Sequence, residues 1–138
     1  MDEPVKRLLD ANVLIALLDP EHVAHGTATG ATETGSWVDR IAILAALRVL
    51  SRKEDSRAVL ARLDQAIQAG RVTFVAEPPA VDGSLRAVID ALPPGEPFNT
   101  DAYLVALATA LDATFVTFDR AIARRFPEAP VLTLGDVE

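Results

Sequence analysis

Short runs of β-branched and aromatic residues alternate with longer apolar runs along most of the chain, and this alternation constrains the fold more than any other feature. The runs at 5–9, 72–75, 114–118 and 131–134 predict strands, and 37–38 predicts a further short one. Strands separated in this way by helical segments form a parallel sheet covered on both faces, with right-handed crossovers. We therefore expect residues 1–138 to form one α/β domain, in which helices flank a central parallel sheet of four to five strands.

The helices are expected where apolar residues recur at helical spacing or fill a segment almost completely. The segment 21–36 is different, because GTATGATETGS contains no large apolar residue, and we expect a loop or at best a weak helix there. A helix before it should end at Asp19-Pro20. The other expected helices cover 39–50, 51–69, 84–92, 101–111 and 119–126.

The composition limits the cellular setting and the kind of partner. The chain contains no cysteine, which excludes disulfides and thiolate metal sites and favours a cytoplasmic protein. The charged start MDEPVKRLLD does not resemble a signal peptide, and no window approaches the roughly 20 apolar residues that a membrane span needs. A net charge of −7 argues against nucleic-acid binding through a broad basic surface, but it is compatible with an acidic pocket that holds a hard cation.

Three aspartates occupy comparable places in the predicted fold. Asp10 ends the first strand, Asp119 follows the strand TFVTF, and Asp101 lies in the first turn of a helix. Any one of them is equally well explained as a residue that favours a helix start. Together, at the edge where parallel strands end, they would repel one another unless a cation such as Mg²⁺ or Mn²⁺ neutralised them. Such an ion can activate water and stabilise charge on a phosphate, which is the chemistry of phosphodiester hydrolysis.

The same residues carry a resemblance to a known family. Three segments look like the acidic motifs of PIN-domain proteins, in the form found in VapC toxins, and a fourth resembles the body of the second motif: LLDANVLIALLD, FNTDAYLVALA, FVTFDRAIA and LRVLS. The resemblance implies that Asp10, Asp101 and Asp119 bind metal, that Asn12 shapes the site, and that Thr117 is its hydroxyl neighbour. It also implies an Mg²⁺- or Mn²⁺-dependent endoribonuclease toxin, a homodimer, an RNA substrate and a cognate VapB-like antitoxin that blocks the site. Arg120 is the arginine best placed to contact phosphate.

The sequence departs from the family pattern at two places. Ile43 stands where many members carry an acid, and the segment 26–36 lacks the apolar stripe of the helix usually found there. Asp39 and Glu33 are weak replacements for the missing acid, and we expect both to be exposed to solvent. These departures motivate an alternative, a catalytically impaired PIN pseudoenzyme that still binds an antitoxin. A response-regulator receiver is disfavoured, because the only lysines are the early Lys6 and Lys53.

The apolar residues outnumber what one small core should require. We therefore expect part of this surface to form a dimer face. The candidates for it are Leu14, Leu17, Leu18, Leu44 and Leu47.

Overall fold

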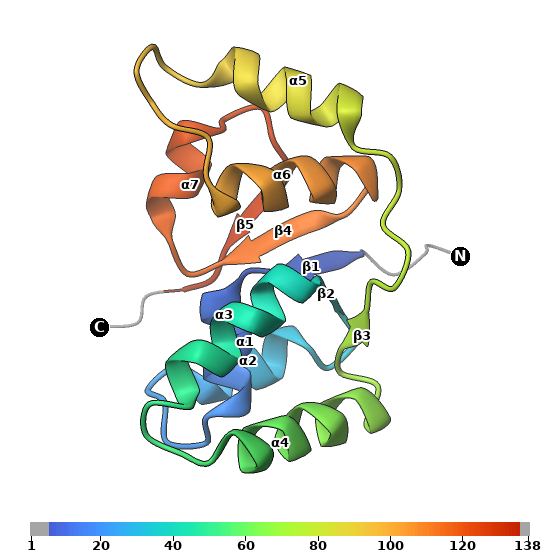
Figure 1. The fold of residues 1–138 in the computed structure, drawn as a ribbon, viewed down its shortest axis with the longest axis vertical. Coiled ribbons are helices and arrows are strands. Elements are labelled where there is room, and N and C mark those ends of the chain that lie inside the picture. The colour runs from blue at the N-terminus through green and yellow to red at the C-terminus, as the bar shows by residue number, and fades with distance from the viewer. Residues whose placement is uncertain (1–5, 136–138) are drawn as a thin grey trace.

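A computed structural model describes residues 6–135 and contains one parallel sheet of five strands in the order β3-β2-β1-β4-β5. Figure 1 shows this sheet between a group of helices formed by α5, α6 and α7 and a second group formed by α1 to α4. The predicted fold class is therefore confirmed. Val5, where we expected the first strand to begin, lies outside the described residues. The strands are β1 (Arg7–Leu9), β2 (Trp37–Val38), β3 (Thr73–Phe74), β4 (Thr114–Thr117) and β5 (Val131–Thr133).

Most helices begin at a short polar side chain that accepts a hydrogen bond from the first turn. Asp10, Asp39, Asp55, Asn99 and Asp119 cap α1, α3, α4, α6 and α7 in this way. Such caps satisfy backbone N–H groups that have no partner within the helix. The helices are α1 (Ala11–Leu18), α2 (His25–Ala31), α3 (Arg40–Leu50), α4 (Ser56–Gln68), α5 (Asp82–Ala91), α6 (Thr100–Ala110) and α7 (Arg120–Arg125).

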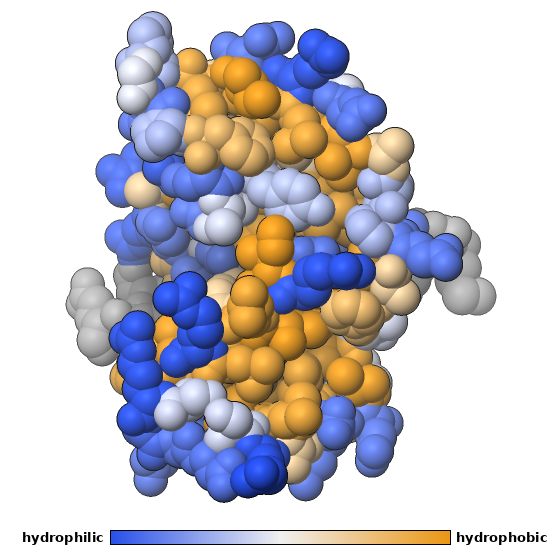
Figure 2. Space-filling model, in the orientation of Figure 1, coloured by the Kyte–Doolittle hydropathy of each residue, from blue (hydrophilic) through white to orange (hydrophobic). Residues whose placement is uncertain are grey.

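Some large apolar side chains remain on the surface. Leu44 on α3 is 61% exposed, and Val49 on α3 and Leu60 on α4 are also exposed. Figure 2 shows apolar side chains gathered over the part of the molecule that α3 and α4 form in Figure 1. Within the described part of the chain, no helix is long and apolar enough to cross a membrane.

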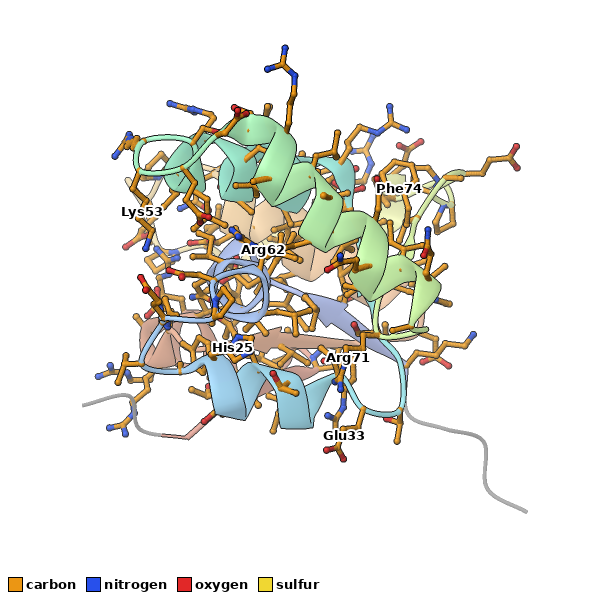
Figure 3. The ribbon with its side chains drawn as sticks, turned by 90° about the horizontal axis from the view of Figure 1, so that it is seen from below. His25, Glu33, Lys53, Arg62, Arg71 and Phe74 are labelled. Carbon is orange, nitrogen blue, oxygen red and sulfur yellow. The ribbon has the colours of Figure 1, made fainter. Side chains whose placement is uncertain are left out.

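The segment 25–31 is a short helix without a side-chain cap, so of the two expectations for 21–36, a loop or at best a weak helix, the second applies to these residues. Figure 3 shows α1 lying between α2 and α4. The buried residues Ala24, Ala28 and Ala31 recur at spacings of four and three and form the inner face of α2. Small side chains allow α2 to pack closely on α1 without large apolar residues, and a stripe made only of alanine gives a weak sequence signal.

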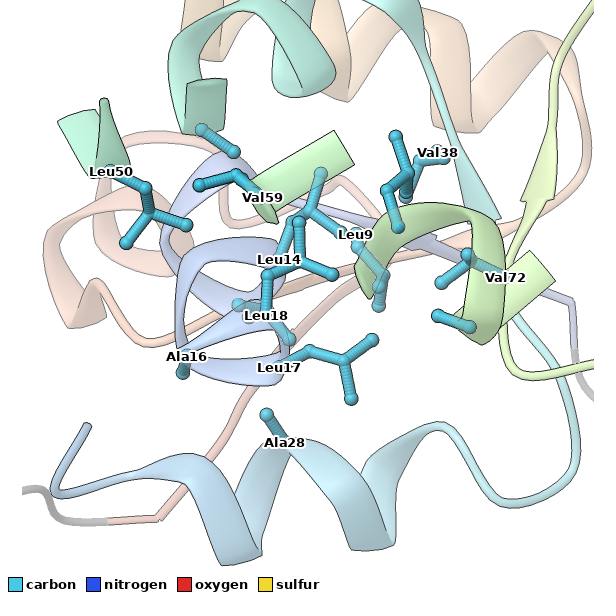
Figure 4. Close-up of a cluster of buried hydrophobic side chains, with 14 of the residues drawn as sticks. Leu9, Leu14, Ala16, Leu17, Leu18, Ala28, Val38, Leu50, Val59 and Val72 are labelled. Atoms are coloured by element: carbon cyan, nitrogen blue, oxygen red, sulfur yellow. The ribbon is translucent and has the colours of Figure 1, made fainter. Parts of the chain in front are cut away.

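The core consists of two clusters, one on each face of the sheet. Along β1, Leu9 faces the cluster formed with α1 to α4 (Figure 4), whereas Leu8 faces the cluster under α5, α6 and α7. Val116 and Phe115 on β4 divide in the same way, as the pleat of a strand requires. Burying a leucine stabilises the fold by about 1.5–3 kcal/mol, so a helix with several buried leucines is strongly anchored.

This packing corrects the expected dimer face. Leu14, Leu17 and Leu18 of α1 are buried in the core, and Leu47 is partly buried against it. Among the five leucines proposed for a dimer face, only Leu44 is largely exposed.

Candidate acidic site at the sheet edge

The site lies where the two central strands end. Leu9 of β1 is in register with Val116 of β4, and the Asp10 N–H donates to the Val116 carbonyl at 2.8 Å. Asp10, which follows β1, and Thr117, the last residue of β4, therefore lie side by side at the same edge of the sheet. This is the edge at which open parallel sheets bind ligands.

A hydrogen-bond network fixes Asp10. The hydroxyl of Thr117 donates to Asp10 Oδ2 at 2.7 Å, and the Ala11 N–H donates to Asp10 Oδ1 at 2.7 Å. Thr117 Oγ1 in turn accepts from Asn12 Nδ2 at 3.2 Å and from the Asp119 N–H at 3.0 Å. Asn12 Oδ1 accepts from the Phe118 N–H at 3.3 Å, so the loop after β4 is tied to the start of α1. Asn12 and Thr117 therefore lie beside Asp10.

Asp101 approaches the same edge from α6. Asn99 caps this helix by accepting from the Ala102 N–H at 3.0 Å, which leaves the half-buried side chain of Asp101 in the first turn. Asp101 Oδ2 lies 3.4 Å from Arg125 Nη2 of α7. Asp119 is exposed and caps α7, accepting from the Ala121 N–H at 2.9 Å. Arg120 is the exposed first residue of α7.

The three acids influence one another electrostatically. Burial is the main cause that raises the pKa of Asp10 from 3.8 to about 6, and the charges of Asp101 and Asp119 raise it further, while the Thr117 hydrogen bond lowers it. Burial also raises the pKa of Asp101, with Arg125 lowering it and Asp119 raising it. As the side chains stand, no three acidic or histidine side chains among residues 6–135 are close enough to share one ion. The three acids are thus close enough to interact electrostatically, but Asp101 is hydrogen-bonded to Arg125.

Among the described interactions, neither of the two replacements considered for the missing acid contacts Asp10, Asp101 or Asp119. Ile43 packs against the core cluster of α1 to α4. Asp39 was expected to be exposed, but it is only 2% exposed because it caps α3 by accepting from the Ile41 N–H at 3.0 Å. Glu33 is exposed, as expected, and Figure 3 places it beyond α2.

Arg125 is the residue of the site that the sequence did not single out. It is one of three arginines on α7, and the sequence favoured Arg120 instead. Its contact with Asp101 depends on how α6 and α7 pack together. No local signal in the sequence distinguishes it from the exposed Arg124.

The described fold has known counterparts. Residues 7–126 match the PIN domain family. The chain is 38% identical to Ribonuclease VapC44 of Mycobacterium tuberculosis over 127 residues, which cover 86% of this chain and 89% of that protein.

Solved structures with a similar fold come from several bacteria. VapBC2 of Rickettsia felis, bound to a DNA fragment from its promoter, has a TM-score of 0.67 at 16% identity and covers 95% of this chain and 100% of its own. FitAcB of Neisseria gonorrhoeae has a TM-score of 0.62 at 18% identity, covering 92% and 96%. VapC20 of Mycobacterium tuberculosis, described as a toxin that cleaves the sarcin-ricin loop, has a TM-score of 0.58 at 14% identity, covering 86% and 93%. At these identities the likeness concerns the fold.

Proposed function

The chain belongs to the PIN-domain family, and on this basis we propose that it is an endoribonuclease toxin that uses Asp10, Asp101 and Asp119 to hold Mg²⁺ or Mn²⁺. One observation carries the proposal. Three separate segments bring carboxylates to one sheet edge, where the charges of Asp101 and Asp119 raise the pKa of the buried Asp10. Transferring a carboxylate from water into the protein interior is unfavourable, so a buried carboxylate is expected to have a compensating cation.

The donor set fits a hard divalent ion. Mg²⁺ and Mn²⁺ prefer carboxylate oxygens and water, and they need only one or two direct protein ligands. Asp10 is the most preorganised of the three ligands, because hydrogen bonds from the Thr117 hydroxyl and the Ala11 N–H fix both of its oxygens. When bound, the ion would activate water and stabilise the charge that develops on the phosphate.

The neighbouring residues have supporting roles in the proposal. Asn12 and Thr117 orient Asp10 and the loop that leads to Asp119. Arg120, at the exposed start of α7, would contact a phosphate of the RNA. Such contacts position the substrate without reading its sequence.

The partners follow from the relatives. VapBC2 of Rickettsia felis is a toxin–antitoxin complex by name, and we propose a VapB-like antitoxin for this chain. We also propose a homodimer, and the exposed apolar side chains on α3 and α4 are the surface that supports it (Figure 2). The alternative of a pseudoenzyme is not favoured, because the 38% identical relative is named a ribonuclease.

The test is RNA cleavage by the purified full chain in Mn²⁺, compared with Asp101→Asn and Asp119→Asn. Each variant should cleave at least about 100-fold more slowly, which is the typical cost of removing a group that stabilises transition-state charge. Asp64→Asn, at an exposed position on α4, is the matched control and should cleave at the wild-type rate. If a variant lacking all three site acids still degraded RNA, the proposed mechanism would be refuted.

A further inference from the structure

Arg125 is held between two acids at the border of the proposed metal site. It lies in the last turn of α7, with Nη2 3.4 Å from Asp101 Oδ2 and Nη1 3.8 Å from Glu96 Oε2. Glu96 belongs to the loop between α5 and α6, which leads directly into the helix that carries Asp101. The guanidinium therefore joins this loop, the start of α6 and the end of α7.

The present contacts leave Arg125 incompletely satisfied. Its Nε is buried and has no hydrogen-bond partner within residues 6–135. The contact with Glu96 is long for a charge-assisted hydrogen bond, which is usually 2.7–2.9 Å, or about 0.9 Å shorter. The guanidinium carries five N–H donors in a planar fork, so it can form more hydrogen bonds if it moves.

The other two acids of the site are engaged differently. Asp10 is bonded to Thr117 and to the Ala11 N–H, and Asp119 caps α7. Among the described contacts of the three acids, it is Asp101 that is bonded to a cationic side chain, that of Arg125. The three acids do not yet gather around a common point, so side chains must turn before they can share one ion.

We propose that Arg125 acts as an internal counter-ion that competes with the divalent ion for Asp101. In the metal-free protein it holds Asp101, and when the ion binds, Asp101 turns to the ion while the guanidinium moves to Glu96. The inference rests on the metal site of the proposed function. Arg125 is in this sense a positioning residue, since it acts on the metal site through Asp101.

The strength of the competition follows from exposure. The side chains of Arg125 and Asp101 are 28% and 31% exposed, so water screens their attraction. Ion pairs of this kind change an equilibrium constant by about fivefold at most. Arg125 should therefore weaken metal binding without preventing it.

The experiment compares Mn²⁺ affinity by calorimetry for the full chain and for Arg125→Gln and Arg124→Gln. Both arginines lie in the last turn of α7, and both changes remove one positive charge near the site, but Arg124 is exposed. Arg125→Gln should bind Mn²⁺ more tightly than Arg124→Gln, by up to about fivefold, because of these two arginines Arg125 is the one with a described contact to Asp101. A merely structural role would not tighten metal binding.

Affinity of Arg125→Gln equal to or weaker than that of Arg124→Gln would overturn the inference. If thermal unfolding shows that Arg125→Gln does not fold, Arg125→Lys replaces it. Lysine keeps the charge but lacks the fork, so a smaller tightening is expected, and no tightening would overturn the inference. Asp10→Asn separates the two proposals. If wild type binds Mn²⁺ and Asp10→Asn does not, a failure of the arginine comparison concerns Arg125 alone. Absence of Mn²⁺ binding by every variant would overturn the metal site and this inference together.

Discussion

Replacing Asp10 by asparagine should make the metal-free protein more stable at neutral pH. Burial and two neighbouring charges raise the pKa of Asp10 from 3.8 to about 6. Between about pH 4 and pH 6 the native state therefore binds more protons than the unfolded chain, and stability falls as the pH rises across this window. A rise of this size corresponds to about 3 kcal/mol of destabilisation at neutral pH. Because Asp10 is only 6% exposed, solvent screening does not remove the effect.

The asparagine also has a cost, which the hydrogen bonds of Asp10 define. Its carboxylate accepts from the Ala11 N–H on one oxygen and from the Thr117 hydroxyl on the other. An amide offers one oxygen and places its NH₂ group against the second donor, which costs about 1–2 kcal/mol. The protonated carboxyl also lacks the second acceptor, so the figure of about 3 kcal/mol already contains this cost. Asp10→Asn should therefore be up to about 3 kcal/mol more stable than wild type at neutral pH, and within about 1 kcal/mol of it near pH 4, where most of the charge is absent.

Urea unfolding in a chelator, at about pH 4.5 and about pH 7.5, measures how this stability difference grows with pH. Asp64→Asn, exposed on α4, is the control and should show no comparable pH dependence. A stability difference between Asp10→Asn and wild type that does not change with pH would contradict the raised pKa of Asp10. It would mean that Asp10 is not a charge confined in an unfavourable environment.

Two further changes test the packing and the hydrogen-bond network. Ala28→Leu should destabilise the protein by about 1–3 kcal/mol, because the fully buried Ala28 leaves no room for a larger side chain between α2 and α1. Thr27→Leu at an exposed position of the same helix is the control, and equal urea midpoints for the two variants would contradict the packing of α2. Thr117→Val should destabilise the protein by about 1–3 kcal/mol, because it removes the hydroxyl that donates to Asp10 and accepts from Asn12 and the Asp119 N–H. It should also raise the pKa of Asp10 further, and an unchanged Asp10 titration by NMR would show that this hydrogen bond does not form.

The sequence predicted the strands, several helix starts and the proximity of two acids of the site, because these depend on local patterns. Asp10 and Asp119 follow strands, and parallel strands end at one edge, so their proximity could be inferred. The cap of α6 is likewise local, because Asn99 directly precedes the helix. Such features are set by residues close together in the chain.

The sequence did not predict features that depend on how helices pack. The alanine face of α2 is apolar only by small side chains, so its burial against α1 was not visible. The capping role of Asp39 buries a residue that looked like a solvent-exposed acid. The contact between Arg125 and Asp101 joins two helices whose relative position no local pattern defines.

The most direct measurement is a crystal of the full chain soaked in millimolar Mn²⁺ and examined by anomalous scattering. We expect an anomalous peak within bonding distance of Asp10 and close to Asp101 and Asp119, with Asp101 turned away from Arg125. A well-ordered crystal that shows no peak at this edge, with Asp101 still on Arg125, would contradict the claim that these carboxylates form a metal site.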